Sequence, residues 1–247
     1  MKKLILLRHG ESEWNLSNKF TGWTDVKLTK KGIEEAGLAA RKILSEKIKI
    51  DSIHTSLLAR SIHTAEIVAN IINFPLSNIK QDWRLNERHY GDLQGFNKSD
   101  IAKEYGEEQV KLWRRSYSIP PPKLSFDDQR HPRFNNKFNK IGADLPDGES
   151  LKDVIERLRP FWNSFFNEKK FLETNYLIVA HSNSLRAIIK TLDKLNDEQI
   201  ISVNIPTGIP LVYTLNDSLS IIEKNYLIDD EDLKAKQTAI VNQGKAI

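Results

Sequence analysis

The sequence predicts an α/β fold with three layers, in which a mainly parallel β-sheet is covered by helices on both faces. Two buried strands are indicated by uninterrupted apolar runs at residues 4–7 and 176–180. Strand and helix patterns also alternate along the first 72 residues, an order typical of parallel sheets. With 247 residues, 39% of them hydrophobic, the chain can bury one full core, and we expect a single domain over 1–247.

The N-terminal part supplies two strand–helix pairs. The strand at 4–7 is followed by a helix at 30–45, for which Thr29 is the expected N-cap. A second short strand at 51–56 leads into a helix at 57–72, so that Arg60 falls in its first turn. The positions of the first helix expected to face the core are Ile33, Ala36, Ala40, Ile43 and Leu44.

The periodicity of apolar residues is weaker in the middle of the chain. From residue 83 to 149 only two helices are predicted, at 99–105 and 107–114, before a long polar stretch that opens at Pro120. Long loops in compact domains commonly serve as lids or binding loops. We therefore expect a lid-like insertion over about 90–149.

The C-terminal part repeats the strand–helix layout. A helix at 150–166, which Pro160 should kink or divide, precedes the strand at 176–180 and a helix at 185–192. Two further strands are expected around a turn at Asn216. The tail at about 229–247 has the composition of a surface helix or a flexible flap.

Composition limits the classes of partner. The net charge of +4 favours anionic ligands, but the lysines and arginines are dispersed and form no block suited to nucleic acid. The absence of cysteine excludes disulfides and thiolate metal sites, and His54, His63, His89 and His131 show no metal-ligand spacing. No apolar run approaches the roughly 20 residues of a membrane span, and the run at 4–7 is too short for a signal peptide. We expect a soluble, cytoplasmic protein without a metal.

Polar groups suited to phosphate follow both buried strands. Arg8 offers two-pronged donors, and His9 can act as a covalent nucleophile if its ring is neutral. Gly10 would let a backbone N–H approach the anion. His181 follows the second strand, where a cationic ring could donate to phosphoryl oxygens. The alternative is a polar turn and two hydrogen-bonded structural histidines, which are common.

A carboxylate at Glu87 stands among cations and close to Tyr90. Glu87 can shuttle the proton of a substrate hydroxyl if it faces the same site. The alternative is a surface carboxylate paired with Arg84 or Arg88, which is the more usual arrangement for such a sequence. The residues alone leave both readings open.

The Arg8-His9-Gly10 motif resembles the phosphate-accepting motif of the histidine phosphatase superfamily. Longer segments are similar to the cofactor-dependent phosphoglycerate mutases in particular, and together they span nearly the whole chain. These segments are residues 8–15, 20–23, 83–91, 94–98, 113–117, 181–186, 205–213 and 242–245.

This resemblance implies an isomerase of glycolysis and gluconeogenesis that interconverts 3-phosphoglycerate and 2-phosphoglycerate. A phosphohistidine at His9 would carry the phosphoryl group, with 2,3-bisphosphoglycerate as the priming donor and no metal. The partners implied are small phosphorylated three-carbon acids and further copies of the chain, as a dimer or tetramer. A phosphatase or bisphosphatase on the same scaffold and a non-catalytic phosphometabolite-binding protein are the alternatives.

The resemblance also implies roles for individual residues. The implied catalytic residues are His9, Glu87, His181, Arg8 and Arg60. The implied substrate-binding residues are Arg8, Ser12, Asn15, Thr21, Gly22, Arg60, Glu87, Arg88, Tyr90, Lys98, Arg114, Arg115, Ser182 and Asn183. Ser182 departs from the family, which has glycine there, so we expect its Cβ to crowd a phosphate or to resist a positive φ, with modestly altered turnover.

Overall fold

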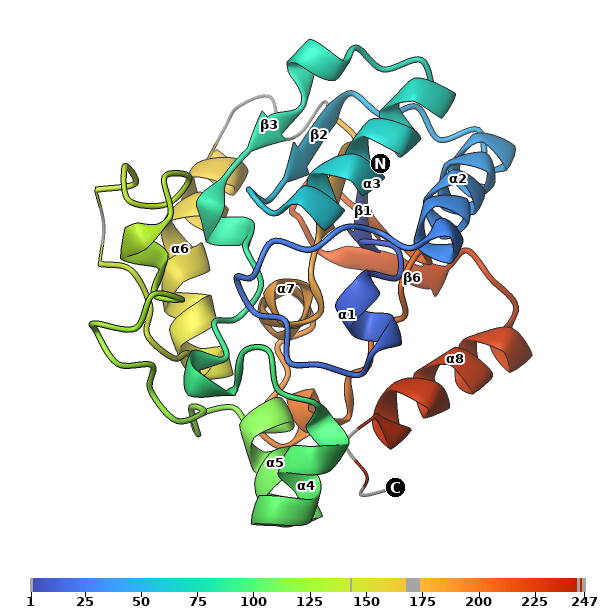
Figure 1. Cartoon of the computed structure of the whole chain (residues 1–247). Coiled ribbons are helices and arrows are strands. Elements are labelled where there is room, and N and C mark those ends of the chain that lie inside the picture. Colours follow the sequence, from blue (N-terminus) through green and yellow to red (C-terminus); the bar gives the residue numbers. More distant parts are fainter. Residues whose placement is uncertain (1, 143, 168–173, 244, 246–247) are drawn as a thin grey trace.

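A six-stranded sheet forms the centre of the molecule (Figure 1). The computed structural model describes residues 2–142, 144–167, 174–243 and 245. The strand order is β3-β2-β4-β1-β5-β6, in which the first four strands are parallel to one another and β5 is antiparallel to both of its neighbours, β1 and β6. The strands are β1 (Lys2–Arg8), β2 (Ser52–Thr55), β3 (Lys80–Gln81), β4 (Tyr176–Ala180), β5 (Pro210–Leu215) and β6 (Ile221–Tyr226). The predicted mainly parallel α/β sheet is confirmed.

Helices cover both faces of this sheet and connect its edges. The α-helices are α1 (Glu13–Leu16), α2 (Lys30–Ser45), α3 (Ala59–Ile71), α4 (Lys98–Tyr105), α5 (Glu107–Arg115), α6 (Leu151–Asn167), α7 (Ser182–Leu192) and α8 (Asp230–Asn242). The 3₁₀ helices are η1 (Leu76–Asn78), η2 (Trp83–Leu85), η3 (Gly91–Leu93), η4 (Pro132–Phe134) and η6 (Gln199–Ser202).

The apolar run of β1 is continuous because both faces of the strand are buried. Successive side chains point to opposite faces, so Leu4 and Leu6 pack in the core beneath α6 and α7. Ile5 and Leu7 pack in the core beneath α2 and α3. This two-sided burial confirms the three layers predicted from the sequence.

The bounds of α2 agree with the prediction, and the Thr29 hydroxyl accepts the N–H of Gly32 as an N-cap. Its predicted core face is partly wrong, because Ile33 and Leu44 are 42% and 45% exposed. The buried stripe instead consists largely of small residues, among them Ala39. Small side chains let α2 approach its neighbours closely, so the larger apolar residues at its edges remain in solvent.

Two other helix predictions need correction. α6 is continuous through Pro160, with Leu158 and Phe161 packed in the core on either side, so the predicted division is wrong, whereas a kink at Pro160 stays a prediction. α7 begins at Ser182 rather than at 185, since the Ser184 hydroxyl accepts the N–H of His181 and completes the first turn. The residues after the second histidine therefore belong to a helix and not to a loop.

The stretch between α5 and α6 and the C-terminal tail both contact earlier segments of the chain. α4 and α5 are followed by a stretch with little regular structure, in which Phe138 packs on Trp23 with ring centroids 4.9 Å apart. The C-terminal tail forms α8, which ends close to α5 (Figure 1). Of the two alternatives for the tail, the helix is the one observed in its described part. None of the helices among the described residues is long and apolar enough to cross a membrane.

Candidate active site

The two histidines meet where β1 and β4 end. The parallel register pairs Arg8 with Ala180, and the His9 N–H donates to the Ala180 carbonyl at 3.0 Å. The His9 and His181 ring centroids are consequently 4.9 Å apart. The predicted pairing of the two histidines in space is confirmed.

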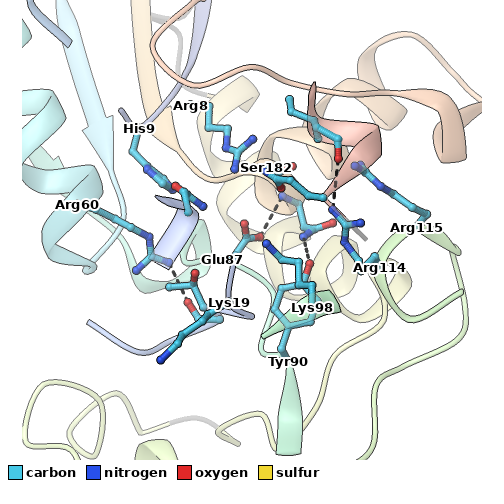
Figure 2. A pocket seen from close by; sticks show the side chains of 16 residues that line it. Arg8, His9, Lys19, Arg60, Glu87, Tyr90, Lys98, Arg114, Arg115 and Ser182 are labelled. Carbon is cyan, nitrogen blue, oxygen red and sulfur yellow. Dashed lines mark hydrogen bonds between the residues drawn. The ribbon is translucent and has the colours of Figure 1, made fainter. Parts of the chain in front are cut away.

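A polar pocket lies over the ends of these two strands (Figure 2). Its lining includes the cations Arg8, Lys19, Arg60, Lys98, Arg114 and Arg115. Glu87 is the single carboxylate of that lining, so with His9 neutral the formal charge is six positive minus one negative, or +5. Such a surface is suited to a small ligand that bears several negative charges.

His9 is held in one orientation and one tautomer. Its Nδ1 lies 2.7 Å from the Gly10 carbonyl oxygen, which can only accept, so Nδ1 carries the proton and Nε2 has the free lone pair. Burial, together with the charges of Arg60 and Arg8, holds the pKa of His9 well below its usual 6.5. The ring is therefore neutral at physiological pH, as a nucleophile requires.

Gly10 is required by a close contact between backbones. A Cβ at this position would lie 2.1 Å from the Gly32 carbonyl oxygen in the first turn of α2. The Gly10 N–H donates to the Thr64 hydroxyl at 3.2 Å and not to the pocket. The expectation that this N–H approaches the anion is wrong, since the glycine instead permits α2 to pack against the strand end.

His181 is fully buried beside His9, and the Ser56 hydroxyl lies 2.7 Å from its Nε2. Burial lowers the pKa of His181 well below 6.5, and the charge of Arg60 and the neighbouring His9 lower it further. The cationic ring that phosphoryl transfer needs at His181 is thus not favoured in the anion-free site, and its presence with phosphate bound stays a prediction. A bound phosphate would oppose the lowering, because its negative charge favours the protonated ring.

Two arginines flank the histidines with their guanidinium groups fixed by backbone carbonyls. Arg8 donates to the Ile205 oxygen at 2.8 Å. Arg60, in the first turn of α3 as predicted, donates to the oxygens of Gly22 and Thr24 at 2.8 and 2.9 Å. Burial lowers the pKa of Arg60 to about 10, which leaves it cationic at neutral pH. Preorganised cations at this end are suited to a phosphoryl group on His9.

Glu87 is buried in the pocket wall. Its Oε1 accepts the N–H of Arg88 at 2.8 Å and the N–H of Asn183 at 3.0 Å. The alternative of a surface carboxylate is wrong, because Glu87 is buried and Arg84 pairs with Asp82 instead. In Figure 2 Glu87 lies between the His9 end of the pocket and the end formed by α5.

A second cationic end is built from α4, α5 and their surroundings. Lys98, Arg114 and Arg115 gather there (Figure 2), and Arg114 donates to the Ile240 carbonyl of α8 at 3.4 Å. Burial and the charges of Arg114 and Arg8 hold the pKa of Lys98 well below 10.5. An anion bound at this end would therefore stabilise its charged form.

Most predicted site residues do line this pocket, although their roles stay predictions. Those that line it are Arg8, His9, Asn15, Thr21, Gly22, Arg60, Glu87, Tyr90, Lys98, Arg114, Arg115, Ser182 and Asn183. His181 lies behind His9 and outside the lining.

Ser12 and Arg88 are also outside the lining, so their predicted contact with substrate is not supported by the geometry. Ser12 is the N-cap of α1 and bonds the Asn15 side chain, which does line the pocket. Arg88 is fully buried and donates to the Tyr90 hydroxyl and the Arg114 carbonyl. Both residues position neighbours rather than form the pocket surface.

Three lining residues were missed from the sequence: Lys19, Ile240 and Gln243. Lys19 directly precedes the Phe20-Thr21-Gly22 motif, and that adjacency was the available signal. Ile240 and Gln243 come from the end of α8 and its C-cap, whose path over the pocket depends on tertiary packing.

Ser182 is the first residue of α7 and lines the pocket. It is absent from the residues with positive φ, so the expectation that Ser182 resists a positive φ is wrong. A glycine at this position is therefore not needed for backbone conformation. The expected steric effect of the serine on a bound phosphate stays a prediction, since Ser182 lines the pocket.

Among the described residues no group of three or more His, Asp or Glu side chains is placed to hold a metal ion. His54 instead packs with Phe161, Phe165 and Tyr176, with ring centroids 5.4 to 5.9 Å apart. The chemistry of the pocket is that of histidine, carboxylate and cationic side chains.

Comparisons with known proteins agree with this geometry. A model of the histidine phosphatase superfamily (branch 1) matches residues 4–133 and 123–218. Proteins named 2,3-bisphosphoglycerate-dependent phosphoglycerate mutase from two strains of Bacteroides fragilis are 47% identical over 246 residues, covering 99% of both chains.

Solved structures show the same fold at lower identity. A mycobacterial glucosyl-3-phosphoglycerate phosphatase in complex with VO₃ is 21% identical, with a TM-score of 0.69 over 91% of this chain and 98% of that one. The α-ribazole phosphatase of Shigella flexneri is 22% identical, with a TM-score of 0.65 over 90% and 94% of the two chains.

Proposed function

Because the chain belongs to the histidine phosphatase superfamily, we propose that it is a phosphoglycerate mutase that depends on 2,3-bisphosphoglycerate. It interconverts 3-phosphoglycerate and 2-phosphoglycerate through a phosphoryl group carried on His9. The observation that supports this most directly is a pocket with two cationic ends, one at a neutral histidine nucleophile and one at α5. A substrate with a phosphate and a carboxylate can occupy both ends at once.

The charge of the lining fits the proposed donor. Each phosphate ester carries about −1.5 to −2 near pH 7, and the carboxylate carries about −1, so 2,3-bisphosphoglycerate carries about −4 to −5. The lining has a formal charge of +5. When bound, this compound supplies the phosphoryl group that first loads His9.

The nucleophile and its neighbours have separate roles in the transfer. His9 Nε2 attacks phosphorus and forms an N–P bond while the P–O bond to the departing hydroxyl oxygen breaks. Arg8 and Arg60 hold the oxygens of the transferring group together with Asn15. His181, beside His9, shares the developing charge.

Glu87 manages the proton of the substrate hydroxyl. It gives a proton to the oxygen that leaves phosphorus, and it takes one from the hydroxyl that attacks the phosphohistidine in the reverse step. Its Oε1 is held by two backbone N–H groups, so the carboxylate is fixed at the pocket wall. The proton that Glu87 gives in one half-reaction is replaced by the proton that it takes in the other, so the proton balance closes over the full cycle.

Water must be excluded while His9 carries the phosphoryl group, because its attack would release phosphate. Ile240 and Gln243 at the end of α8 line the pocket, and Ile240 contacts Arg114. We assign closure to α8 together with the 90–149 segment. By family resemblance we also expect a cytoplasmic enzyme of glycolysis and gluconeogenesis that forms a dimer or tetramer.

The test is the rate of 2-phosphoglycerate formation from 3-phosphoglycerate with and without catalytic 2,3-bisphosphoglycerate. We expect turnover that depends on the bisphosphate and is abolished in His9→Ala. Release of inorganic phosphate without isomerisation would identify a phosphatase instead. Ligand binding without either reaction would identify a binding protein.

A further inference from the structure

Two arginines are completely buried behind the α5 end of the pocket. Arg88 and Arg186 each have 0% exposure, and neither lines the pocket. No ion pair joins either one to a carboxylate within the described ranges. Burying a cation without a paired anion is costly, so stability alone is a poor explanation for both residues.

Each of these arginines donates to the backbone of one anion-binding arginine. Arg88 Nη2 lies 2.7 Å from the Arg114 carbonyl oxygen, and Arg186 Nη2 lies 3.1 Å from the Arg115 carbonyl oxygen. These are the last two carbonyls of α5, where intrahelical donors are lacking and positive charge is favoured. The buried pair therefore caps the helix at the two residues whose side chains enter the pocket.

The same guanidinium groups extend to other pocket residues. Arg88 donates to the Tyr90 hydroxyl at 3.1 Å, and the Asn183 amide donates to that hydroxyl at 3.2 Å. Arg186 in turn donates to the Asn183 amide oxygen at 2.9 Å. This continuous network joins the end of α5 to both Tyr90 and Asn183. Glu87 is connected to this network as well, because its Oε1 accepts the backbone N–H groups of Arg88 and Asn183.

We propose that Arg88 and Arg186 are positioning residues that orient Arg114 and Arg115 toward the second anionic group of the substrate. This inference rests on the proposed function and deepens it, because it assigns specificity for a two-anion substrate to residues outside the pocket lining. The buried pair also adds positive potential behind that end. Burial and the charge of Arg88 lower the pKa of Arg186 to about 10, so it remains cationic at neutral pH.

The test compares two ligands in the Arg186→Lys variant. The Arg186 guanidinium donates at once to the Asn183 amide oxygen, the Arg115 carbonyl and the Ile200 carbonyl, the last at 2.8 Å. Lysine keeps the charge, but its single ammonium group lacks this planar fork of donors. Orthovanadate, a mimic of the transferring phosphoryl group, probes the His9 end. 3-Phosphoglycerate probes both ends.

We expect the Kd for orthovanadate to stay within about twofold, while Kd and KM for 3-phosphoglycerate rise about tenfold with little change in kcat. Arg159→Lys is the matched control, because Arg159 is 58% exposed on α6, and it should alter neither ligand. Arg88→Lys tests the other buried guanidinium by the same comparison of ligands. It replaces Arg186→Lys in the test if that variant does not fold.

Unchanged affinity for 3-phosphoglycerate, or an equal loss for both ligands, would overturn the proposal. The binding measurements need no turnover. A wild-type protein that fails to isomerise 3-phosphoglycerate would refute the proposed function, whereas the ratio of the two affinities would still decide whether the buried arginines position the α5 end.

Discussion

Glu87→Gln separates the proton-transfer role of Glu87 from its structural role. Glutamine has nearly the same shape, and its amide oxygen can accept the N–H groups of Arg88 and Asn183 as Oε1 does. Oε2 accepts no hydrogen bond from any other residue in the described part of the chain. The substitution therefore keeps the two backbone supports and removes only the basic oxygen and its charge.

The expected magnitude follows from these contacts. Loss of a general acid–base group lowers rates by about 10² to 10⁴, which corresponds to about 2.7 to 5.4 kcal/mol in the activation barrier. The formal charge of the lining rises from +5 to +6, so anion binding should not weaken. We expect kcat to fall by that factor while KM stays equal or decreases.

Steady-state kinetics with 3-phosphoglycerate at saturating 2,3-bisphosphoglycerate measures both constants. Glu108→Gln is the matched control, because its side chain is 84% exposed on α5, and its kcat should equal that of the wild type. A kcat for Glu87→Gln within threefold of wild type would refute the proton-transfer role. A raised KM with unchanged kcat would make Glu87 a binding residue only.

Three further predictions concern the tail, the departure from the family and the response to acid. Deleting residues 230–247 removes the pocket contacts of α8, so the ratio of phosphate release to isomerisation should rise several-fold; an unchanged ratio would argue against closure by the tail. Ser182→Gly should change turnover or phosphate affinity modestly, and if kinetic and binding assays detect neither change, the serine has no functional effect. Burial lowers the pKa of His54 from its ordinary 6.5 to about 4 in the folded protein. Below pH 6.5 the unfolded state therefore binds more protons than the folded state, and at pH 5 this difference lowers the free energy of unfolding by about 2 kcal/mol. Urea unfolding should therefore show His54→Phe gaining about 2 kcal/mol relative to wild type between pH 8 and pH 5. Ser52→Ala, which only removes the hydrogen-bond partner of His54, should show no such gain.

The sheet and the histidine pair could be predicted because local sequence determines them. A strand buried on both faces needs an unbroken apolar run, and His9 and His181 directly follow the two strands that contain such runs. Once β1 and β4 pair in parallel, their ends must meet at one edge. Thr29 was found for a similar reason, since an N-cap is a local signal.

Other features depend on which way a side chain points after folding. Arg88 stands next to Glu87 in sequence, yet its guanidinium donates to the Arg114 carbonyl at the end of α5 and is not part of the pocket lining. The sequence also could not place Lys19 or Gln243 in the lining, because each enters it from a separate segment. The two-residue strand β3 is too short to show any periodicity.

The protonation of His181 could not be read from the sequence either. The pKa of His181 depends on its burial, on the charges of Arg60 and Arg8, and on the neighbouring His9. These residues come from separate segments of the chain. The sequence suggested a cationic ring, whereas the anion-free site favours a neutral one. A gain of charge at His181 on binding phosphate therefore stays a prediction, because it depends on the assembled site.

Transfer of label through His9 tests the central claim most directly. The protein is incubated with 2,3-bisphosphoglycerate labelled in its phosphoryl groups, and the phosphoprotein is then chased with unlabelled 3-phosphoglycerate. We predict an acid-labile label on His9 that moves into phosphoglycerate, with 2-phosphoglycerate as the product. Label that leaves only as inorganic phosphate, or no label on His9, would contradict the mutase.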